Sequence, residues 1–254
     1  MIDTHAHLDG CESGPEELLA RAREAGVDRV IAVGSGIDSC RASLAIAESE
    51  RGVFAALGIH PHQAGGEEAE RLTELAELLR HERAVAVGET GLDFYRDWAP
   101  HERQRQLFAA QLELASRVGK PVVIHNREAD SETADALAGF GGAVILHCFS
   151  SPGLLDVALE RDYYVSFAGN VTYPSAEELR EAAKRIPAER ILAETDSPYL
   201  APVPRRGRPN EPANVVGTVG ALAQARGEHP DDLASQIEAN ATAAFSLPVG
   251  SPAP

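Results

Sequence analysis

The chain has 254 residues, and its 39 acidic and 23 basic residues give a formal net charge of −16, so a nucleic-acid substrate would need local cations to overcome long-range repulsion. No segment offers the roughly 18 consecutive apolar residues of a membrane-spanning helix, and the opening MIDTHAHLDG contains no secretory signal. Cys11, Cys40 and Cys148 form no CxxC pair, which suits a reducing compartment, so we expect a soluble, cytoplasmic protein without membrane contact.

Short apolar runs rich in β-branched residues alternate with longer amphipathic stretches along the chain. The pattern predicts strands at 1–4, 29–33, 53–58, 84–88, 121–124, 143–146, 163–167 and 190–193. Helical spacing of apolar residues predicts helices between them, for example at 15–25, 67–80, 100–118 and 175–185. Proline near a first helical turn, as in Gly14-Pro15 and Ser151-Pro152, marks several helix starts.

The repeated strand–helix unit predicts the fold class. Eight such units without an antiparallel hairpin signal favour a closed barrel over an open doubly wound sheet. The GxGxxG fingerprint of dinucleotide binding is absent after the first strand. We therefore predict an α/β protein with a single (β/α)₈ TIM barrel over residues 1–245. The small residues and prolines of 246–254 predict a flexible C-terminal tail.

Histidines and carboxylates gather where the predicted strands end. Five of the nine histidines lie at or just beyond the carboxyl end of a strand, namely His5, His7, His60, His125 and His147. Glu89 and Asp196 take the same place after the fourth and eighth strands. Because these strand ends converge on one face of a barrel, the side chains should meet there. His5 and His7 are two residues apart on an extended backbone, so both imidazoles point the same way.

These side chains predict a metal centre. A single strand-end histidine is more often structural, but six ligand-type side chains on one rim favour metal binding, and they are His5, His7, Glu89, His125, His147 and Asp196. Six ligands exceed what one tetrahedral zinc needs, so we expect two divalent ions that share a carboxylate. Glu89 is the expected bridge, since Lys120 and Lys184 lie too far from the rim to serve as a carboxylated lysine.

The motifs around these residues resemble those of the TatD-type metal-dependent deoxyribonucleases, a family of the amidohydrolase superfamily. The matching segments, in order over roughly residues 1–245, are DTHAHLD (3–9), GIHPH (58–62), GETGLDFYR (88–96), HNREA (125–129), LHCFS (146–150), ETDSPYLAP (194–202) and RGRPNEP (206–212). One departure is the loop Ser150-Ser151-Pro152, where the family often has a glycine after the first serine.

The resemblance implies how the metals are held and used. One ion would be bound by His5, His7, Glu89 and Asp196, and the other by Glu89, His125 and His147. The resemblance also implies dependence on magnesium, manganese or zinc, and hydrolysis of phosphodiester bonds in DNA. An imidazole-rich ligand set suits zinc or manganese better than magnesium, which prefers oxygen ligands.

The expected mechanism uses metal-activated water, because a divalent ion lowers the pKa of bound water. Asp196 would ligate one ion and accept the proton of that water, and Glu89 would hold both ions. His60 has no place in either ligand set, so we expect it to contact the phosphate or the leaving oxygen. The alternative for His60 is a structural role in the His-Pro-His turn.

Two further predictions concern charged residues near the eighth strand. Arg205, Arg206 and Arg208 follow that strand and would contact flanking phosphates; the alternative is a solvated basic loop. Glu194 lies two residues before Asp196 and should be buried beneath it. We expect Glu194 to accept a hydrogen bond from a metal-bound imidazole, whereas the alternative is an internal ion pair unrelated to metal.

The predicted function is that of a phosphodiesterase on single-stranded DNA or DNA ends, acting as a 3′–5′ exonuclease. The alternative enzyme class is an ester or amide hydrolase of the same family, for example one that acts on D-aminoacyl-tRNA. A binding module that keeps only the fold is a third class, but none of the six ligand positions is degraded. The sequence does not determine the oligomeric state, and a monomer is the expectation.

Overall fold

The computed structural model describes residues 1–96 and 98–248. Within them, parallel strands form one eight-stranded sheet in which each strand pairs with the next along the chain. The strands are β1 (Ile2–Ala6), β2 (Arg29–Ser35), β3 (Val53–Gly58), β4 (Ala84–Asp93), β5 (Val122–Arg127), β6 (Val144–Leu146), β7 (Tyr164–Phe167) and β8 (Ile191–Ala193). Each begins within one residue of its predicted position.

Hydrogen bonds after β8 close the sheet onto β1. Asp196 N donates to His5 O (3.0 Å) and His7 N donates to Ser197 O (2.8 Å). Ala6 and Ser197 form a parallel bridge. The predicted (β/α)₈ TIM barrel is therefore confirmed, and its closure runs through the backbone of three expected metal ligands, His5, His7 and Asp196.

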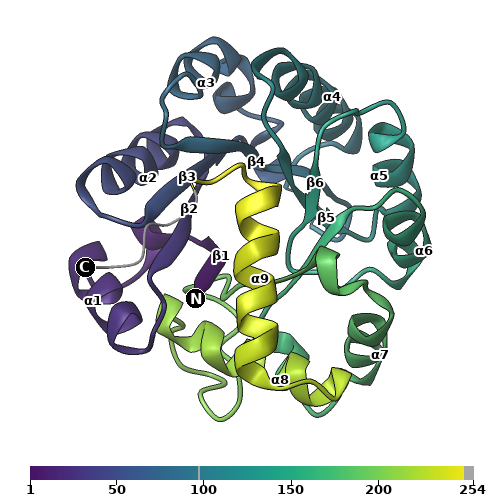
Figure 1. Ribbon diagram of the computed structural model, residues 1–254. Helices are drawn as coiled ribbons and strands as arrows, with labels where there is room; N and C mark the ends of the chain where they lie inside the picture. The colour runs from purple at the N-terminus through teal and green to yellow at the C-terminus, as the bar shows by residue number, and fades with distance from the viewer. Residues whose placement is uncertain (97, 249–254) are drawn as a thin grey trace.

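Helices surround the barrel, as Figure 1 shows. They are α1 (Pro15–Glu24), α2 (Ile37–Ser49), α3 (Leu72–Leu78), α4 (His101–Val118), α5 (Asp130–Leu137), α6 (Pro152–Glu160), α7 (Glu177–Arg185), α8 (Val215–Arg226) and α9 (Pro230–Ala244). The helix predicted over 67–80 is interrupted, because Glu67–Glu70 forms a 3₁₀ turn before α3 begins. In that turn the Glu68 carboxylate accepts a hydrogen bond from Ile37 N (2.7 Å), the first residue of α2. No helix of the described residues is both long and apolar enough to cross a bilayer.

Two buried glutamines of α4 hold the strand ends that carry the site. Gln111 Oε1 accepts from Ile59 N (2.8 Å), and Gln111 Nε2 donates to Ile59 O (2.9 Å) and to Thr90 Oγ1 (2.7 Å). Seven residues earlier on the same helix face, Gln104 pairs with both Asp93 N and Asp93 O. Unpaired backbone groups are costly when buried, and these amides satisfy them where β3 and β4 leave the regular ladder.

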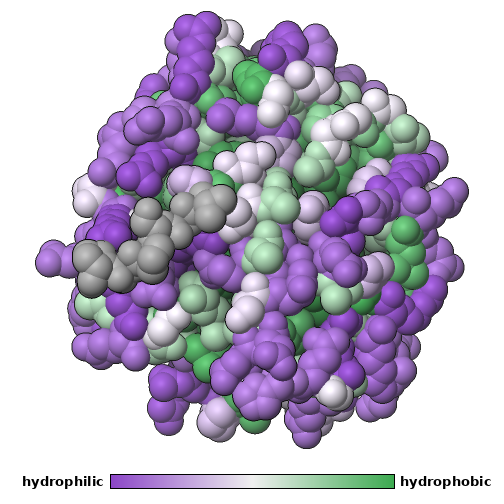
Figure 2. Space-filling model, in the orientation of Figure 1, coloured by the Kyte–Doolittle hydropathy of each residue, from purple (hydrophilic) through white to green (hydrophobic). Residues whose placement is uncertain are grey.

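The helix α9 crosses the amino ends of the strands and covers that end of the barrel (Figure 1). Asn240 on α9 donates to Ala188 O (2.7 Å) and to Ile191 O (2.8 Å), which fixes the helix to the start of β8. Figure 2 shows the same face, with hydrophilic side chains around its rim. Because this end is closed, the functional site belongs at the opposite, carboxyl end of the strands.

The described chain continues past the barrel to residue 248. Leu247 is 5% exposed and packs against the core. Residues 249–254, which make up most of the predicted tail, lie outside the described residues.

Candidate metal centre

A bulge in β4 directs Glu89 into the barrel. The strand is longer than the predicted 84–88, and its register against β5 shifts between Val87 and Thr90. At Gly91, where φ is +140°, a Cβ atom would lie 2.0 Å from His125 O, so only glycine fits. Bulges re-aim side chains next to active sites. The result here is a carboxylate, 3% exposed, that points to the centre of the carboxyl-end face.

One oxygen of the Glu89 carboxylate faces the histidines of β1. Glu89 Oε2 lies 3.7 Å from His5 Nε2 and 3.6 Å from His7 Nε2. The Asp196 Oδ1 atom completes this group at 3.9 Å and 3.7 Å from the same two nitrogens. The nitrogen–oxygen separations all exceed a hydrogen bond, while the two imidazole nitrogens lie 3.3 Å from each other. The two nitrogens and the two carboxylate oxygens thus surround a shared space.

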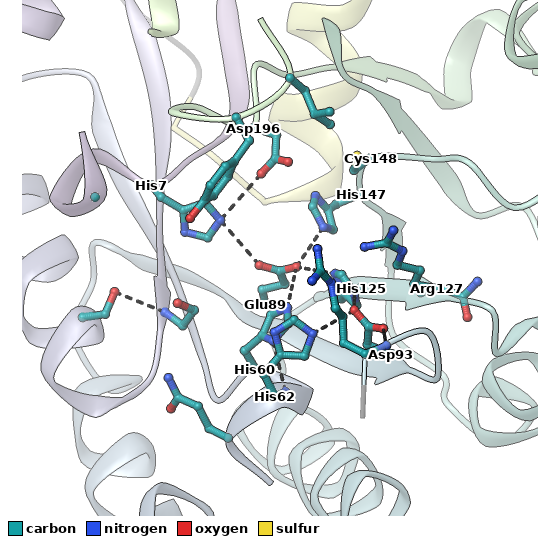
Figure 3. A pocket seen from close by; sticks show the side chains of 18 of the residues that line it. His7, His60, His62, Glu89, Asp93, His125, Arg127, His147, Cys148 and Asp196 are labelled. Atoms are coloured by element: carbon teal, nitrogen blue, oxygen red, sulfur yellow. Dashed lines mark hydrogen bonds and ion pairs between the residues drawn. The ribbon is translucent and has the colours of Figure 1, made fainter. Parts of the chain in front are cut away.

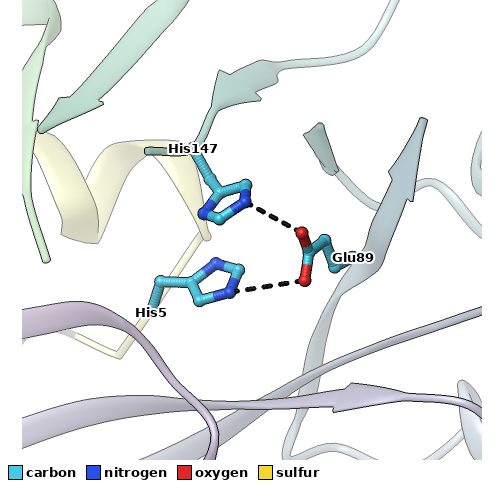
Figure 4. A group of neighbouring side chains, drawn as sticks. All are labelled: His5, Glu89 and His147. Atoms are coloured by element: carbon cyan, nitrogen blue, oxygen red, sulfur yellow. Dashed lines mark ion pairs between the residues drawn. The ribbon is translucent and has the colours of Figure 1, made fainter. Parts of the chain in front are cut away.

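The other oxygen of Glu89 faces a second group of imidazoles. Glu89 Oε1 lies 2.8 Å from His125 Nδ1 and 2.9 Å from His147 Nε2. His60 Nε2 is 3.4 Å from the same oxygen. Figure 3 shows these side chains pointing toward Glu89 from different strands, and Figure 4 shows His5 and His147 meeting its two oxygens. The carboxylate therefore lies between two sets of donor atoms.

Outer carboxylates determine which nitrogen each imidazole of the second group presents. His147 Nδ1 lies 3.0 Å from Glu194 Oε1, and His125 Nε2 lies 3.1 Å from Asp93 Oδ2. Each imidazole donates one N–H to that carboxylate, and although burial opposes it, the surrounding carboxylates raise the pKa of both His125 and His147, so that the other ring N–H donates to Glu89. A divalent ion bound to that second nitrogen would take the place of its proton. The contact of Glu194 with a strand-end histidine is the one that the sequence predicts, while its role toward a metal stays a prediction.

The backbone fixes the tautomer of His60. Its Nδ1 accepts a hydrogen bond from His62 N (3.2 Å), so in the neutral ring Nε2 carries the proton. Burial lowers the pKa of His60 to about 4, which keeps the ring neutral. Its Nε2–H group faces Glu89, so His60 presents a hydrogen-bond donor rather than a lone pair. This geometry fits the predicted role in phosphate contact better than a role as metal ligand.

Burial and charge in the centre suit a bound cation. Burial lowers the pKa of His5 to about 4, and a neutral imidazole is the form that binds a metal. Burial, together with the negative charges of Glu194 and Glu89, raises the pKa of Asp196 to about 8. Among the described residues no side chain donates a hydrogen bond to the Asp196 carboxylate. An opposite charge is therefore missing beside it, and a divalent ion would supply one.

The donor atoms are close enough for metal binding. Ligand atoms within 4.8 Å of one another occur in the described groups His5, Glu89 and His147, and His5, His7 and Asp196. His60, Glu89 and His125 form a further such group, in which the tautomer argues against His60 as a ligand. The buried imidazoles and carboxylates are thus arranged to hold divalent metal, while the number of ions stays a prediction.

A pocket of about 1050 Å³ opens over this centre at the carboxyl end of the barrel. Its lining includes Arg96, Trp98 and Arg127, none of which the sequence predicts as a site residue. The predicted arginines of the loop after β8 do not line it. Arg206 instead lies over the Tyr173 ring, 4.4 Å from the ring centre. The predicted contact of this loop with DNA remains a prediction.

The sequence prediction also missed Asp93 and His62. Besides His125, Asp93 Oδ2 contacts His62 Nε2 (2.8 Å), and Asp93 Oδ1 accepts from the backbone N–H of Tyr95 and Arg96. The available signal was its place in the segment GETGLDFYR, four residues after Glu89. On a regular strand positions 89 and 93 face the same side, but the bulge between them makes that inference unsafe.

Known proteins match this chain over nearly its whole length. The family model described as "TatD related DNase" matches residues 2–246. A Mycobacterium tuberculosis protein named "Uncharacterized metal-dependent hydrolase TatD" is 40% identical over 97% of this chain and 98% of its own. A Pantoea vagans protein named "3'-5' ssDNA/RNA exonuclease TatD" is 37% identical over 97% of this chain and its full length. The crystal structure of YJJV, a TatD homolog from Escherichia coli, superposes with a TM-score of 0.90 at 32% identity, covering 98% of both chains.

Proposed function

The chain belongs to the TatD related DNase family, and from this premise we propose that it is a divalent-metal-dependent hydrolase of phosphodiester bonds at the 3′ ends of DNA strands. The observation that carries the proposal is the position of Glu89, with one oxygen toward each of two donor groups. Shared carboxylates of this kind bridge the paired metals of phosphodiesterases. The direction of cleavage is supported by the Pantoea vagans relative, which is named a 3'-5' exonuclease.

Two divalent ions would be held on either side of Glu89. We assign one to His5, His7, Glu89 and Asp196, and the other to Glu89, His125 and His147. Such a pair stabilises the negative charge that develops on a phosphoryl group and activates water for attack. The imidazole-rich donor set favours zinc or manganese over magnesium.

Side chains in and beside the pocket would accept the proton, contact the phosphate and orient the imidazoles. The Asp196 carboxylate faces the pocket. A divalent ion beside it would favour its ionised form, in which it would accept a proton from the attacking water. His60 offers its Nε2–H to a phosphate oxygen that enters the pocket beside Glu89. Asp93 and Glu194 hold His125 and His147 in the orientation that this arrangement requires.

The test is an assay on labelled oligonucleotides before and after chelation. Single-stranded DNA labelled at the 5′ end should be shortened stepwise from the 3′ end, and activity should return when zinc, manganese or magnesium is restored. The same preparation is assayed on D-aminoacyl-tRNA. Hydrolysis of the aminoacyl ester without cleavage of DNA would contradict the proposal and favour the ester hydrolase of the same family.

A further inference from the structure

Large aromatic side chains are exposed on opposite sides of the pocket. Trp98, in the segment after β4, is 64% exposed, and Tyr199, in the segment after β8, is 61% exposed. Both line the pocket. Tryptophan and tyrosine usually bury most of their surface, so rings left open at the edge of a functional pocket indicate a binding surface.

The two rings lie beside different histidines of the metal centre. The Trp98 ring centre lies 4.3 Å from that of His62, which in turn lies 4.2 Å from that of His60. The Tyr199 ring centre lies 6.2 Å from that of His7, on the Asp196 side of the centre. A chain that crosses the pocket over Glu89 would therefore meet one exposed aromatic ring before the reacting bond and one after it.

The positive charge of the pocket lies on one side only. Arg96 and Arg127 are the only lysine or arginine residues among its described lining residues. Arg96 lies 5.2 Å from the Trp98 ring centre, and Arg127 lies 3.8 Å from the ring centre of Tyr95, whose ring Arg96 also approaches at 5.7 Å. Neither guanidinium forms an ion pair with any described residue, so both remain free for an anion. Figure 3 shows Arg127 across Glu89 from His7.

The opposite side has no lysine or arginine among the described lining residues, and it carries the carboxylate of Asp9. Asp9 follows His7 by two residues and lines the pocket, with its carboxylate accepting a hydrogen bond from Ser39 Oγ (2.6 Å). A carboxylate without a neighbouring cation repels phosphate groups. This side therefore suits the end of a strand rather than a continuing backbone.

Resting on the proposed function, we propose that the pocket holds a single-stranded polynucleotide in one direction. The body of the strand lies on the Trp98 side, where its phosphates contact Arg96 and Arg127 and a base stacks on Trp98. The terminal nucleoside lies on the acidic side, with its base against Tyr199. Stacking on exposed aromatic rings combined with a cationic track is how proteins bind single strands without reading sequence. Bases paired in a duplex cannot stack on these rings, so the strand must be single at its end.

The first experiment compares KM for a short single-stranded oligodeoxynucleotide with KM for a small nucleotide aryl phosphodiester. Trp98→Ala should raise KM for the oligonucleotide about 10-fold, and more than it raises KM for the small ester. Trp98→Phe should restore most of the affinity, because it keeps an aromatic ring. Equal KM values for the oligonucleotide in the Trp98→Ala variant and the wild-type protein would overturn the proposal.

The second experiment measures how oligonucleotide binding depends on salt. The double variant Arg96→Ala/Arg127→Ala should flatten the slope of log K against log salt by about 1.4, at about 0.7 for each single-strand phosphate contact. The matched control is Arg80→Ala, since Arg80 is 74% exposed near the amino end of β4 and far from the pocket. An unchanged slope in the double variant would remove both arginines from the binding track.

The third experiment tests the direction of the strand with abasic oligonucleotides. When the 3′-terminal nucleotide lacks its base, no base remains to stack on Tyr199, so Tyr199→Ala should no longer change KM. Trp98→Ala should still raise KM, because the base that stacks on Trp98 is present. The reverse result would overturn the assigned direction. A wild-type protein that cleaves the small ester but no oligonucleotide would instead refute the proposed function, so the two failures are distinguishable.

Discussion

The two ends of the barrel bury polar groups in opposite ways. At the amino end Asn240 has both amide hydrogens on backbone carbonyl groups, and its Oδ1 accepts from Gln236 Nε2 (2.8 Å). At the carboxyl end Glu89 Oε2 and Asp196 Oδ1 are 3.6 Å or more from the nitrogens of His5 and His7. At the amino end, Asn240 thus satisfies its polar groups within the chain and serves stability. The carboxyl end leaves its donor atoms aimed at a common space and serves binding.

The largest expected effect of this difference appears when divalent ions are removed. Chelation should lower kcat on DNA by more than about 1,000-fold, because the ions supply more charge than a single oxyanion-hole donor. The fold should persist, since the core and the amino end contain their own contacts. Activity assays and circular dichroism on the same chelated sample check both statements. Unfolding on chelation would show that the metals support the barrel as a whole.

The carboxylates that orient the imidazoles should show a smaller effect. Asp93→Asn and Glu194→Gln should each weaken metal binding about 10- to 100-fold, because each removes a charged partner of a ligand histidine. Glu177→Gln, at a position where the side chain is 78% exposed, is the matched control. Metal titration followed by calorimetry measures the affinities. Wild-type affinity in both variants would contradict the assigned tautomers of His125 and His147.

A substitution at the amino end should affect stability without affecting the metals. Asn240→Ala leaves the carbonyl groups of Ala188 and Ile191 without their partner, which should lower the free energy of unfolding by about 2 kcal/mol. Metal content and kcat should match the wild-type protein. Chemical denaturation and metal analysis together test the separation of the two ends. A loss of metal in this variant would show that the amino end and the metal centre depend on each other.

The smallest expected effect concerns the basic loop after β8. Replacing Arg205, Arg206 and Arg208 together with alanine should change the salt slope of DNA binding by less than about 0.7, one phosphate contact. The reason is that these residues do not line the pocket. A change of about 2 would instead support the contact with DNA that the sequence predicts for this loop.

The sequence predicted the strands and the gathering of histidines and carboxylates at the strand ends, because both follow from local pattern. Apolar runs of strand length mark the barrel, and the barrel itself brings distant strand ends together. Asp93 was missed because a bulge separates it from Glu89 and changes which way the later residues point. The sequence favours the basic loop because it is close to Asp196 along the chain, and its contact with DNA stays a prediction. The sequence prediction did not single out Arg127. It is the last residue of β5, lines the pocket and lies over the ring of Tyr95 in the segment after β4.

If Glu89 holds two ions at once, metal stoichiometry should reveal it. Wild-type protein loaded with zinc or manganese and analysed by mass spectrometry should contain two equivalents. His7→Ala should lose one of them, because His7 faces only one oxygen of Glu89. Glu89→Gln should lose both, because a neutral amide cannot compensate two cations. Two full equivalents of metal in the Glu89→Gln protein would contradict the proposal that Glu89 holds both ions.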